Sequence, residues 1–291
     1  MQTSSDDDGD TSAILTKTIV LALFILPISV YKSPQKTKPL FHSVASKVEV
    51  TTVSKAPVKV KKTSKKKRLY ITFDDGPNRG TKNVLHIVQD EAIPVSFFVV
   101  GEHVFASPTQ SMLWDSLKMA RQIELCNHSY SHAHNHYSDY YQSPDSVVKD
   151  FQRTHDSLNL GNTIARTPGR NIWRIDTLQY TDLKSSKVAA DSLQRAGFIL
   201  IGWDLEWHFD PKTMSITTSA EDLINQIDSL FKYNKLKNPD HLVLLAHDQV
   251  YVKPDDSLQL RLFLQLLKQR GDYEISLVSD YPGSGSRGLK D

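Results

Sequence analysis

The chain has 291 residues, of which 39% are hydrophobic and 9% aromatic, so it can bury the core of one large domain or two small ones. Its single cysteine, Cys126, excludes an intramolecular disulfide. The net charge of +2 is unevenly spread, because residues 1–68 carry 13 basic and 5 acidic side chains whereas residues 69–291 carry 22 and 28. The acidic larger part argues against nucleic acid as a substrate.

An apolar segment follows an acidic start near the N-terminus. Residues 13–31 form a 19-residue window that includes Lys17 and Pro27, and a spanning helix needs about 20 apolar residues. Because no small-residue cleavage site follows, we expect residues 1–31 to be a tail and an uncleaved signal anchor that crosses the cell membrane once. The lysines after this segment favour a cytoplasmic position for the rest of the chain.

Residues 32–67 are rich in Lys, Ser, Thr and Pro, and residues 55–68 contain a basic run. This composition predicts a flexible linker, whose lysines could also contact anionic lipid or an anionic wall polymer. We therefore expect three parts: the tail and anchor at 1–31, the linker at 32–67, and a catalytic domain at 68–291.

Strand-like and helix-like patterns alternate through the third part. The expected strands are 69–73, 94–100, 122–126, 198–203, 242–246 and 274–278. The expected helices are 83–91, 109–121, 143–160, 185–196, 220–233 and 255–270. Alternation of this kind predicts an α/β fold, in which helices cover a sheet of parallel strands.

The first expected strand, at 69–73, ends in two adjacent carboxylates. Asp74 and Asp75 follow its apolar run, and Gly76 and Pro77 then break the pattern. This predicts a strand that carries two acids at its carboxyl end, where α/β folds place their chemistry. The alternative is a simple turn, since Asp, Gly and Pro all favour turns.

Four histidines lie within nine residues, from position 128 to position 136. His128 and His132 are four apart, so on one helical turn their rings would share a face and could bind one ion. His132 and His136 form a rival pair with the same spacing. A solvated, histidine-rich loop is the alternative that involves no metal.

A third strand pattern, at 242–246, ends in His247 and Asp248. Three expected strand ends thus present two carboxylates, a His-x-x-x-His pair, and a His-Asp pair. Two histidines and one carboxylate make a three-ligand metal set that leaves a position for water. The remaining carboxylate and histidine can transfer protons, which is what hydrolysis of an amide or ester requires.

Three of these segments resemble signature motifs of the polysaccharide deacetylases, carbohydrate esterase family four, which share the NodB-homology domain. The motifs are TFDDGP at 72–77, HSYSH at 128–132 and LLAHD at 244–248, and FFVVG at 97–101 resembles the family's second strand. The resemblance covers roughly residues 68–278. It implies a distorted (β/α) barrel with fewer than eight repeats. It also implies removal of N-acetyl groups from a GlcNAc-containing polysaccharide, such as peptidoglycan, by a domain that faces the periplasm or the exterior.

The resemblance also implies a role for each motif residue. Asp75, His128 and His132 would hold a divalent metal, with Zn²⁺ the first expectation and Co²⁺, Mn²⁺ or Ni²⁺ as alternatives. Asp74 would be the general base toward a metal-bound water, and His247 would be the general acid toward the departing amine.

A fourth motif departs from the family pattern. The family usually has Arg-x-Pro-aromatic-Gly, whereas this chain has RTPGR at 166–170. Arg166 is expected to pair with Asp74, and the backbone N–H of Gly169 is expected to bind the oxyanion. The aromatic wall that would follow the proline is missing.

A fifth motif departs as well. The family's Asp-Trp pair is replaced by Glu206 and Trp207, with Asp204 two residues earlier, so either acid could orient or charge His247. Trp203 and Trp207 could line the sugar or pack in the core. These departures keep open the alternative of a non-catalytic glycan-binding relative. An O-deacetylase of an acetylated glycan is a second alternative, because the sequence does not separate amide from ester chemistry.

Overall fold

The computed structural model describes residues 66–285, which make up most of the expected catalytic domain. The expected anchor at 13–31, and all of the expected linker except residues 66 and 67, lie outside the described residues. Within residues 66–285, no helix is both long enough and apolar enough to cross a membrane.

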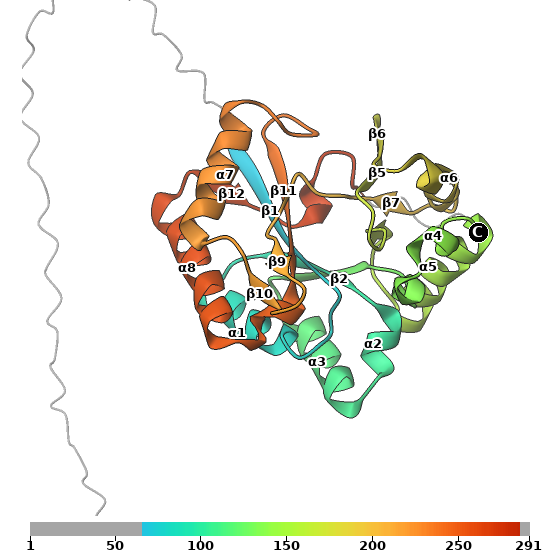
Figure 1. Cartoon of the computed structure of the whole chain (residues 1–291), viewed down its shortest axis with the longest axis horizontal. Helices are drawn as coiled ribbons and strands as arrows, with labels where there is room; N and C mark the ends of the chain where they lie inside the picture. The colour runs from blue at the N-terminus through green and yellow to red at the C-terminus, as the bar shows by residue number, and fades with distance from the viewer. Residues whose placement is uncertain (1–65, 286–291) are drawn as a thin grey trace, which may run out of the picture. The chain divides into compact units, whose positions relative to one another are not determined.

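Ten strands form one mixed sheet, in the order β6-β5-β7-β4-β3-β2-β1-β11-β8, with β12 paired to β1 (Figure 1). In the run β7-β4-β3-β2-β1-β11-β8, each strand is parallel to its neighbours, and β12 is parallel to β1. Strand β5 is antiparallel to both β6 and β7. Among the described residues no ladder joins β6 to β8, so the barrel is open. The ten strands are β1 (Lys67–Asp74), β2 (Val95–Val99), β3 (Ile123–Asn127), β4 (Ile164–Ala165), β5 (Ile172–Ile175), β6 (Leu178–Thr181), β7 (Ile199–Leu200), β8 (Leu205–Glu206), β11 (His241–His247) and β12 (Tyr273–Ile275).

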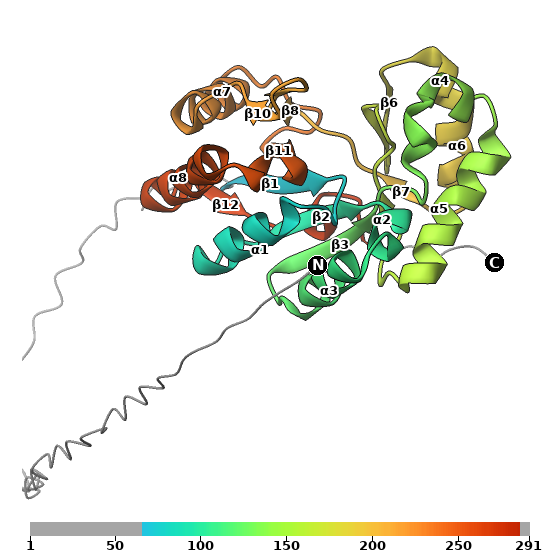
Figure 2. The same cartoon turned by 60° about the horizontal axis from the view of Figure 1, so that its bottom comes forward.

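A separate antiparallel hairpin, β9 (Phe209–Asp210) and β10 (Ser215–Ile216), follows β8. Eight α-helices and four 3₁₀ helices complete the described part of the chain. Figures 1 and 2 show α1, α7 and α8 gathered on one side and α4, α5 and α6 on the other. The helices are α1 (Thr81–Asp90), α2 (Gly101–Phe105), α3 (Pro108–Met119), η1 (His132–Asn135), α4 (Tyr137–Tyr140), α5 (Pro144–Leu158), η2 (Lys184–Ser186), α6 (Lys187–Arg195), α7 (Ala220–Lys232), η3 (Asp248–Val252), α8 (Pro254–Arg270) and η4 (Val278–Asp280).

The core follows the two-residue period of the strands. Leu69, Ile71 and Phe73 of β1 belong to an outer cluster that includes side chains of α1, α7 and α8. Tyr70 belongs instead to an inner cluster, together with Phe98 of β2. Because β1 is buried on both faces, its sequence is a nearly continuous apolar run, as expected for a central parallel strand.

The expected α/β fold is confirmed, and each of the twelve expected elements has a counterpart within about three residues at either end. The sequence patterns missed the helices α2 and α4, the strands β4, β5, β6 and β8, and the β9–β10 hairpin. These elements are two to five residues long, and periodicity cannot be recognised over so short a window.

Candidate active site

The carboxyl ends of neighbouring parallel strands bring the motif residues together. Asp74 of β1 lies directly opposite His247 of β11 in the ladder register. Asn127 of β3 lies opposite Ala165 of β4, so the next residues, His128 and Arg166, are neighbours. Three motifs and the arginine therefore meet at one edge of the sheet, because parallel strands end on the same side.

Arg166 and Asp74 form the expected ion pair, with 2.8 Å between Arg166 Nη1 and Asp74 Oδ1. Arg166 is fully buried, and it also donates to the hydroxyl of Thr72 and to the carbonyl oxygens of Ile201 and Gly202. Burial lowers the pKa of the guanidinium, although the carboxylate of Asp74 opposes this effect. The bonds hold the Asp74 carboxylate in one orientation.

Asp75, His128 and His132 bring one ligand atom each to within 4.8 Å of one another. Asp75 Oδ1 lies 3.4 Å from His128 Nε2 and 3.2 Å from His132 Nε2. His128 Nδ1 lies 2.9 Å from the carbonyl oxygen of Arg166, and a carbonyl only accepts, so Nδ1 carries the proton. This bond fixes the tautomer in which Nε2 can bind a metal, as is usual for metal-binding histidines.

The chemistry of these three residues fits a divalent cation. The buried Oδ1 of Asp75 has no hydrogen-bond partner in the described structure. Burial would raise the pKa of Asp75, but interactions with His128 and His132 outweigh it and hold the pKa well below its usual range. Burial would likewise lower the pKa of His128, but the carboxylates of Asp74 and Asp75 outweigh it and raise the pKa. A cation at this point would take the place of the proton that the imidazole otherwise attracts.

The expectation that His128 and His132 share one helical turn is wrong. His128 directly follows β3, and His132 begins a turn in which residues 132, 133, 134 and 135 all have positive φ, from 43° to 63°. The two ring centroids lie 5.1 Å apart, and the loop between them contains Ser129 at φ 67°, whose hydroxyl accepts from the backbone N–H of His132. Left-handed backbone is unfavourable for residues other than glycine, and such strain concentrates at functional sites. The rival ligand His136 is not part of the cluster.

Neither expected acid bonds to His247 in the described structure. Its buried Nδ1 has no partner, and its ring instead packs against Phe209, with centroids 5.2 Å apart. Asp204 accepts from the backbone N–H groups of Lys237 and Val243, and burial raises its pKa to about 6. The expectation that Asp204 orients His247 is therefore wrong, because its carboxylate is already engaged with a neighbouring loop and strand.

Glu206 does reach the site. It lines the same cleft as His247, and its Oε1 lies 3.5 Å from His208 Nδ1. The two tryptophans differ. Trp203 lines the cleft, whereas Trp207 is 2% exposed, donates to the carbonyl oxygen of Thr218 and packs with aromatic side chains of the outer core. The sugar-facing alternative for Trp207 is wrong, and core packing is its role.

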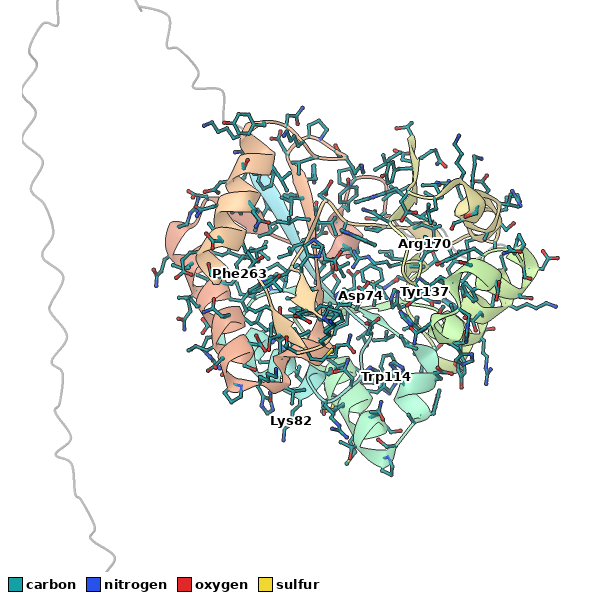
Figure 3. All side chains as sticks on the ribbon, viewed as in Figure 1. Asp74, Lys82, Trp114, Tyr137, Arg170 and Phe263 are labelled. Atoms are coloured by element: carbon teal, nitrogen blue, oxygen red, sulfur yellow. The ribbon has the colours of Figure 1, made fainter. Side chains whose placement is uncertain are left out.

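The cleft itself has a volume of about 680 Å³. Of the predicted site residues it contains the expected metal ligands, both proposed proton-transfer groups, Gly169, Trp203 and Glu206, while Arg166 lies behind it. Figure 3 shows Asp74 near the middle of the molecule, with Tyr137 and Arg170 to one side. Sequence reasoning missed several lining residues, of which all but Leu245 of β11 come from short or irregular segments: His103, Asn135, Tyr137, Thr167, Phe209, Pro211, Met214, Leu245 and Gln249.

Two missed residues support Asp75. His103 Nδ1 lies 2.8 Å from the backbone carbonyl oxygen of Asp75, and Gln249 Nε2 lies 3.4 Å from its Oδ2. Asp248 bonds instead to Asn78 and to the hydroxyl of Thr81, and so ties the loop after β1 to the end of β11. Burial raises the pKa of Asp248 to about 7. No sequence motif pointed to His103 or Gln249.

Comparison with known proteins agrees with these motifs. A protein-family model described as polysaccharide deacetylase matches residues 61–175. YheN of Bacillus subtilis (strain 168), provisionally described as a polysaccharide deacetylase, is 23% identical over 221 residues, covering 74% of this chain and 68% of that protein. A chitooligosaccharide deacetylase of Rhizobium leguminosarum bv. phaseoli is 27% identical over 165 residues, covering 55% of this chain and 61% of that protein.

A solved structure shares the fold. The catalytic domain of a peptidoglycan N-acetylglucosamine deacetylase from Eubacterium rectale superimposes with a TM-score of 0.54 at 20% identity, covering 78% of this chain and 94% of that one. At this identity the likeness establishes the architecture, and the site must be argued from its own residues.

Proposed function

Because the chain belongs to the polysaccharide deacetylase family of hydrolases, we propose that it removes N-acetyl groups from a GlcNAc-containing polysaccharide of the cell envelope, with a divalent metal, most simply Zn²⁺. One observation carries this proposal. At a single edge of the sheet, a three-residue metal set lies beside a carboxylate fixed by a buried arginine and opposite a histidine.

The metal set supplies the electrophile. A cation held by Asp75, His128 and His132 would polarise the acetamide carbonyl and lower the pKa of a water molecule. A backbone N–H group completes the proposed site. Gly169 lines the cleft, and its N–H is our proposed donor to the oxyanion that forms when water attacks the carbonyl.

Asp74 and His247 divide the proton transfers. Arg166 binds Oδ1 of Asp74, and the other oxygen, Oδ2, lies 3.6 Å from His128 Nε2. Oδ2 therefore faces the metal set, where it could accept a proton from a water molecule. We assign Asp74 the proton taken from water and His247 the proton given to the departing amine. Glu206, which shares the cleft, is the acid best placed to influence His247.

The experiment is an acetate-release assay with the full chain on a substrate panel: N-acetylglucosamine oligomers, peptidoglycan and an O-acetylated xylan. We expect release from the N-acetylated substrates, loss of release with a chelator, and recovery with added Zn²⁺. Release from the ester alone would identify an O-deacetylase instead. Binding of an oligomer without any acetate release would identify a glycan-binding relative.

The location of the activity is part of the proposal. An acetylated envelope polymer lies outside the inner membrane, so we propose that residues 13–31 anchor the chain and that its catalytic domain faces the periplasm or the exterior. The lysines that follow the anchor oppose this orientation. An alkaline phosphatase reporter fused after Asp291 should be active, and activity of a cytoplasmic reporter alone would contradict the proposal.

A further inference from the structure

The loop after Pro168 has no side chain at position 169, and the ring of Tyr137 occupies the space where one would project. A Cβ on Gly169 would lie 3.0 Å from both Cε1 and Cζ of Tyr137. We infer that Tyr137 is the surface against which the sugar ring of the substrate packs, an inference that rests on the proposed function. Gly169 leaves the room that this ring needs.

The local backbone presents Tyr137 to the cleft. The left-handed turn at 132–135 ends just before α4, and Tyr137 is the first residue of that helix. Its hydroxyl donates to Asn135 Oδ1 at 3.0 Å. Tyr141, one turn further along, donates to the carbonyl oxygen of Pro168 at 2.7 Å, so the tyrosine helix and the glycine loop are bonded to each other. The Tyr137 ring and the backbone of Gly169 are thus held in a fixed relative position.

Tyr137 is half-buried, and its ring borders the reacting groups. It meets His132 edge to face, with centroids 5.7 Å apart and planes 86° apart, and it lines the same cleft as Asp75 and His247. A neutral ring beside a metal set offers apolar surface and no competing charge.

This surface suits a pyranose ring. One face of an N-acetylglucosamine unit exposes C–H groups, which pack on an aromatic ring, while its hydroxyls need hydrogen bonds at the edges. Asn135, which accepts from the Tyr137 hydroxyl, also lines the cleft, and the guanidinium carbon of Arg170 lies over the Tyr137 ring at 5.8 Å from its centre, so polar groups are close to the aromatic surface. Tyr137 would therefore position the sugar so that its acetamide reaches the metal set.

The first test measures the steady-state kinetics of the full chain on an N-acetylglucosamine oligomer. Tyr137→Ala should raise KM about tenfold with little change in kcat, because it removes binding that substrate and transition state share. Tyr137→Phe should stay within about twofold of the wild type, since the ring is kept. An unchanged KM in Tyr137→Ala would overturn the inference.

Zinc titration of Tyr137→Ala separates substrate packing from support of His132. We expect the stoichiometry and affinity for Zn²⁺ to match the wild type. Weakened zinc binding would show that the ring serves to hold the histidine, and would overturn the inference.

A double-mutant cycle with Gly169→Ala tests the spatial pairing. With Tyr137 in place, the added methyl group lies 3.0 Å from the ring, so the ring must move by a few tenths of an ångström to accommodate it, while the backbone strain at φ +62° is the same in either background. Gly169→Ala should therefore raise KM less when residue 137 is already alanine. Equal effects in the two backgrounds would show that the ring and the glycine act independently, against the inference.

The two proposals fail in different ways. If the wild type releases no acetate from any substrate, the proposed function fails. The Tyr137 inference is then judged by calorimetric binding of the same oligomer to the wild type and to Tyr137→Ala. Weaker binding by the variant supports it, and equal binding overturns it.

Discussion

The two halves of the cleft are built in different ways. The reacting half consists of the three expected metal ligands and the two proposed proton-transfer groups. Asp74, Asp75, His128 and His247 lie at the ends of β1, β3 and β11, where parallel ladders fix their positions, and His132 joins them from a turn. The outer half consists of Tyr137, the glycine loop and the β9–β10 hairpin, which turns and short segments hold in place. Chemistry is thus attached to the most rigid part of the fold and substrate contact to its loops, so the two can change independently.

The largest expected effect lies in the reacting half. His128→Ala and His132→Ala should each weaken Zn²⁺ binding at least about a thousandfold, because one of three ligands is lost. Metal content after dialysis measures this directly. His136→Ala is the matched control and should keep its metal, and loss of metal there instead would move the site to the rival histidine pair.

Proton transfer should be separable from metal binding. Asp74→Asn and His247→Ala should each lower kcat by about 10²–10⁴-fold, the usual worth of a positioned acid or base. Both variants should keep stoichiometric zinc. A variant that retains near wild-type turnover would remove that residue from the mechanism and leave the rest of the assignment standing.

Two buried arginines permit a comparison of stability: Arg166, which pairs with Asp74 in the reacting half, and Arg174 of β5, which lies outside the lining of the cleft. Arg166→Leu should cost about 3–5 kcal/mol of unfolding free energy, since it leaves the buried Asp74 without its partner. Arg174→Leu should cost only roughly 1–2 kcal/mol, because its partner Asp191 is 28% exposed and water can solvate the carboxylate. Urea denaturation measures both. Equal costs would show that the exposure of the partner carboxylate does not set the cost of losing the arginine.

Asp248 makes stability depend on pH. Its folded pKa of about 7 lies above the ordinary 3.8, so the fold favours the neutral acid. That stabilisation is fully present below about pH 4 and is lost as the pH rises through about 7. Asp248→Asn fits the site, since the Thr81 hydroxyl can accept as well as donate. The melting temperature of the variant should therefore fall less between these pH values than that of the wild type, and parallel curves would contradict this assignment.

The smallest effect concerns the left-handed turn. Ala133 has φ 56° and is 6% exposed, and glycine adopts this conformation without the penalty of a Cβ. Ala133→Gly should raise the unfolding free energy by up to about 1 kcal/mol, measured by thermal melting. The outer half should thus tolerate, and even gain from, changes that the reacting half would not accept. A destabilised variant would show that the turn is not strained.

The two halves of the cleft also differ in how much of their structure could be predicted from the sequence. Asp74 and His247 could be placed because an apolar run followed by an ionisable residue defines a strand end, and parallel strands share that end. His132 was assigned to the right cluster by motif resemblance but to the wrong local structure, since no pattern reveals four consecutive left-handed residues. Asp204 and Glu206 could not be separated, because a two-residue strand gives no periodicity from which to decide which side chain points inward.

Tyr137 and Phe209 mark the limit of that reasoning. Each acts through a contact with a residue far along the chain, Gly169 and His247 respectively. Single-sequence patterns describe neighbours a few positions apart and carry no information on such pairings.

The pairing of β1 with β11 determines at which stage of chain synthesis the candidate active site can form. Asp74 faces His247, and Thr81 bonds Asp248 from 167 positions away, so the reacting groups come together only after β11 has been synthesised. Until then the edge of β1 is an unpaired apolar strand, and such non-local pairing is slow to form. A nascent or truncated chain without β11 has the residues of the metal set but lacks His247, the proposed acid, and the bond between Thr81 and Asp248. On the proposed mechanism, hydrolysis is therefore expected only from molecules in which β11 has formed.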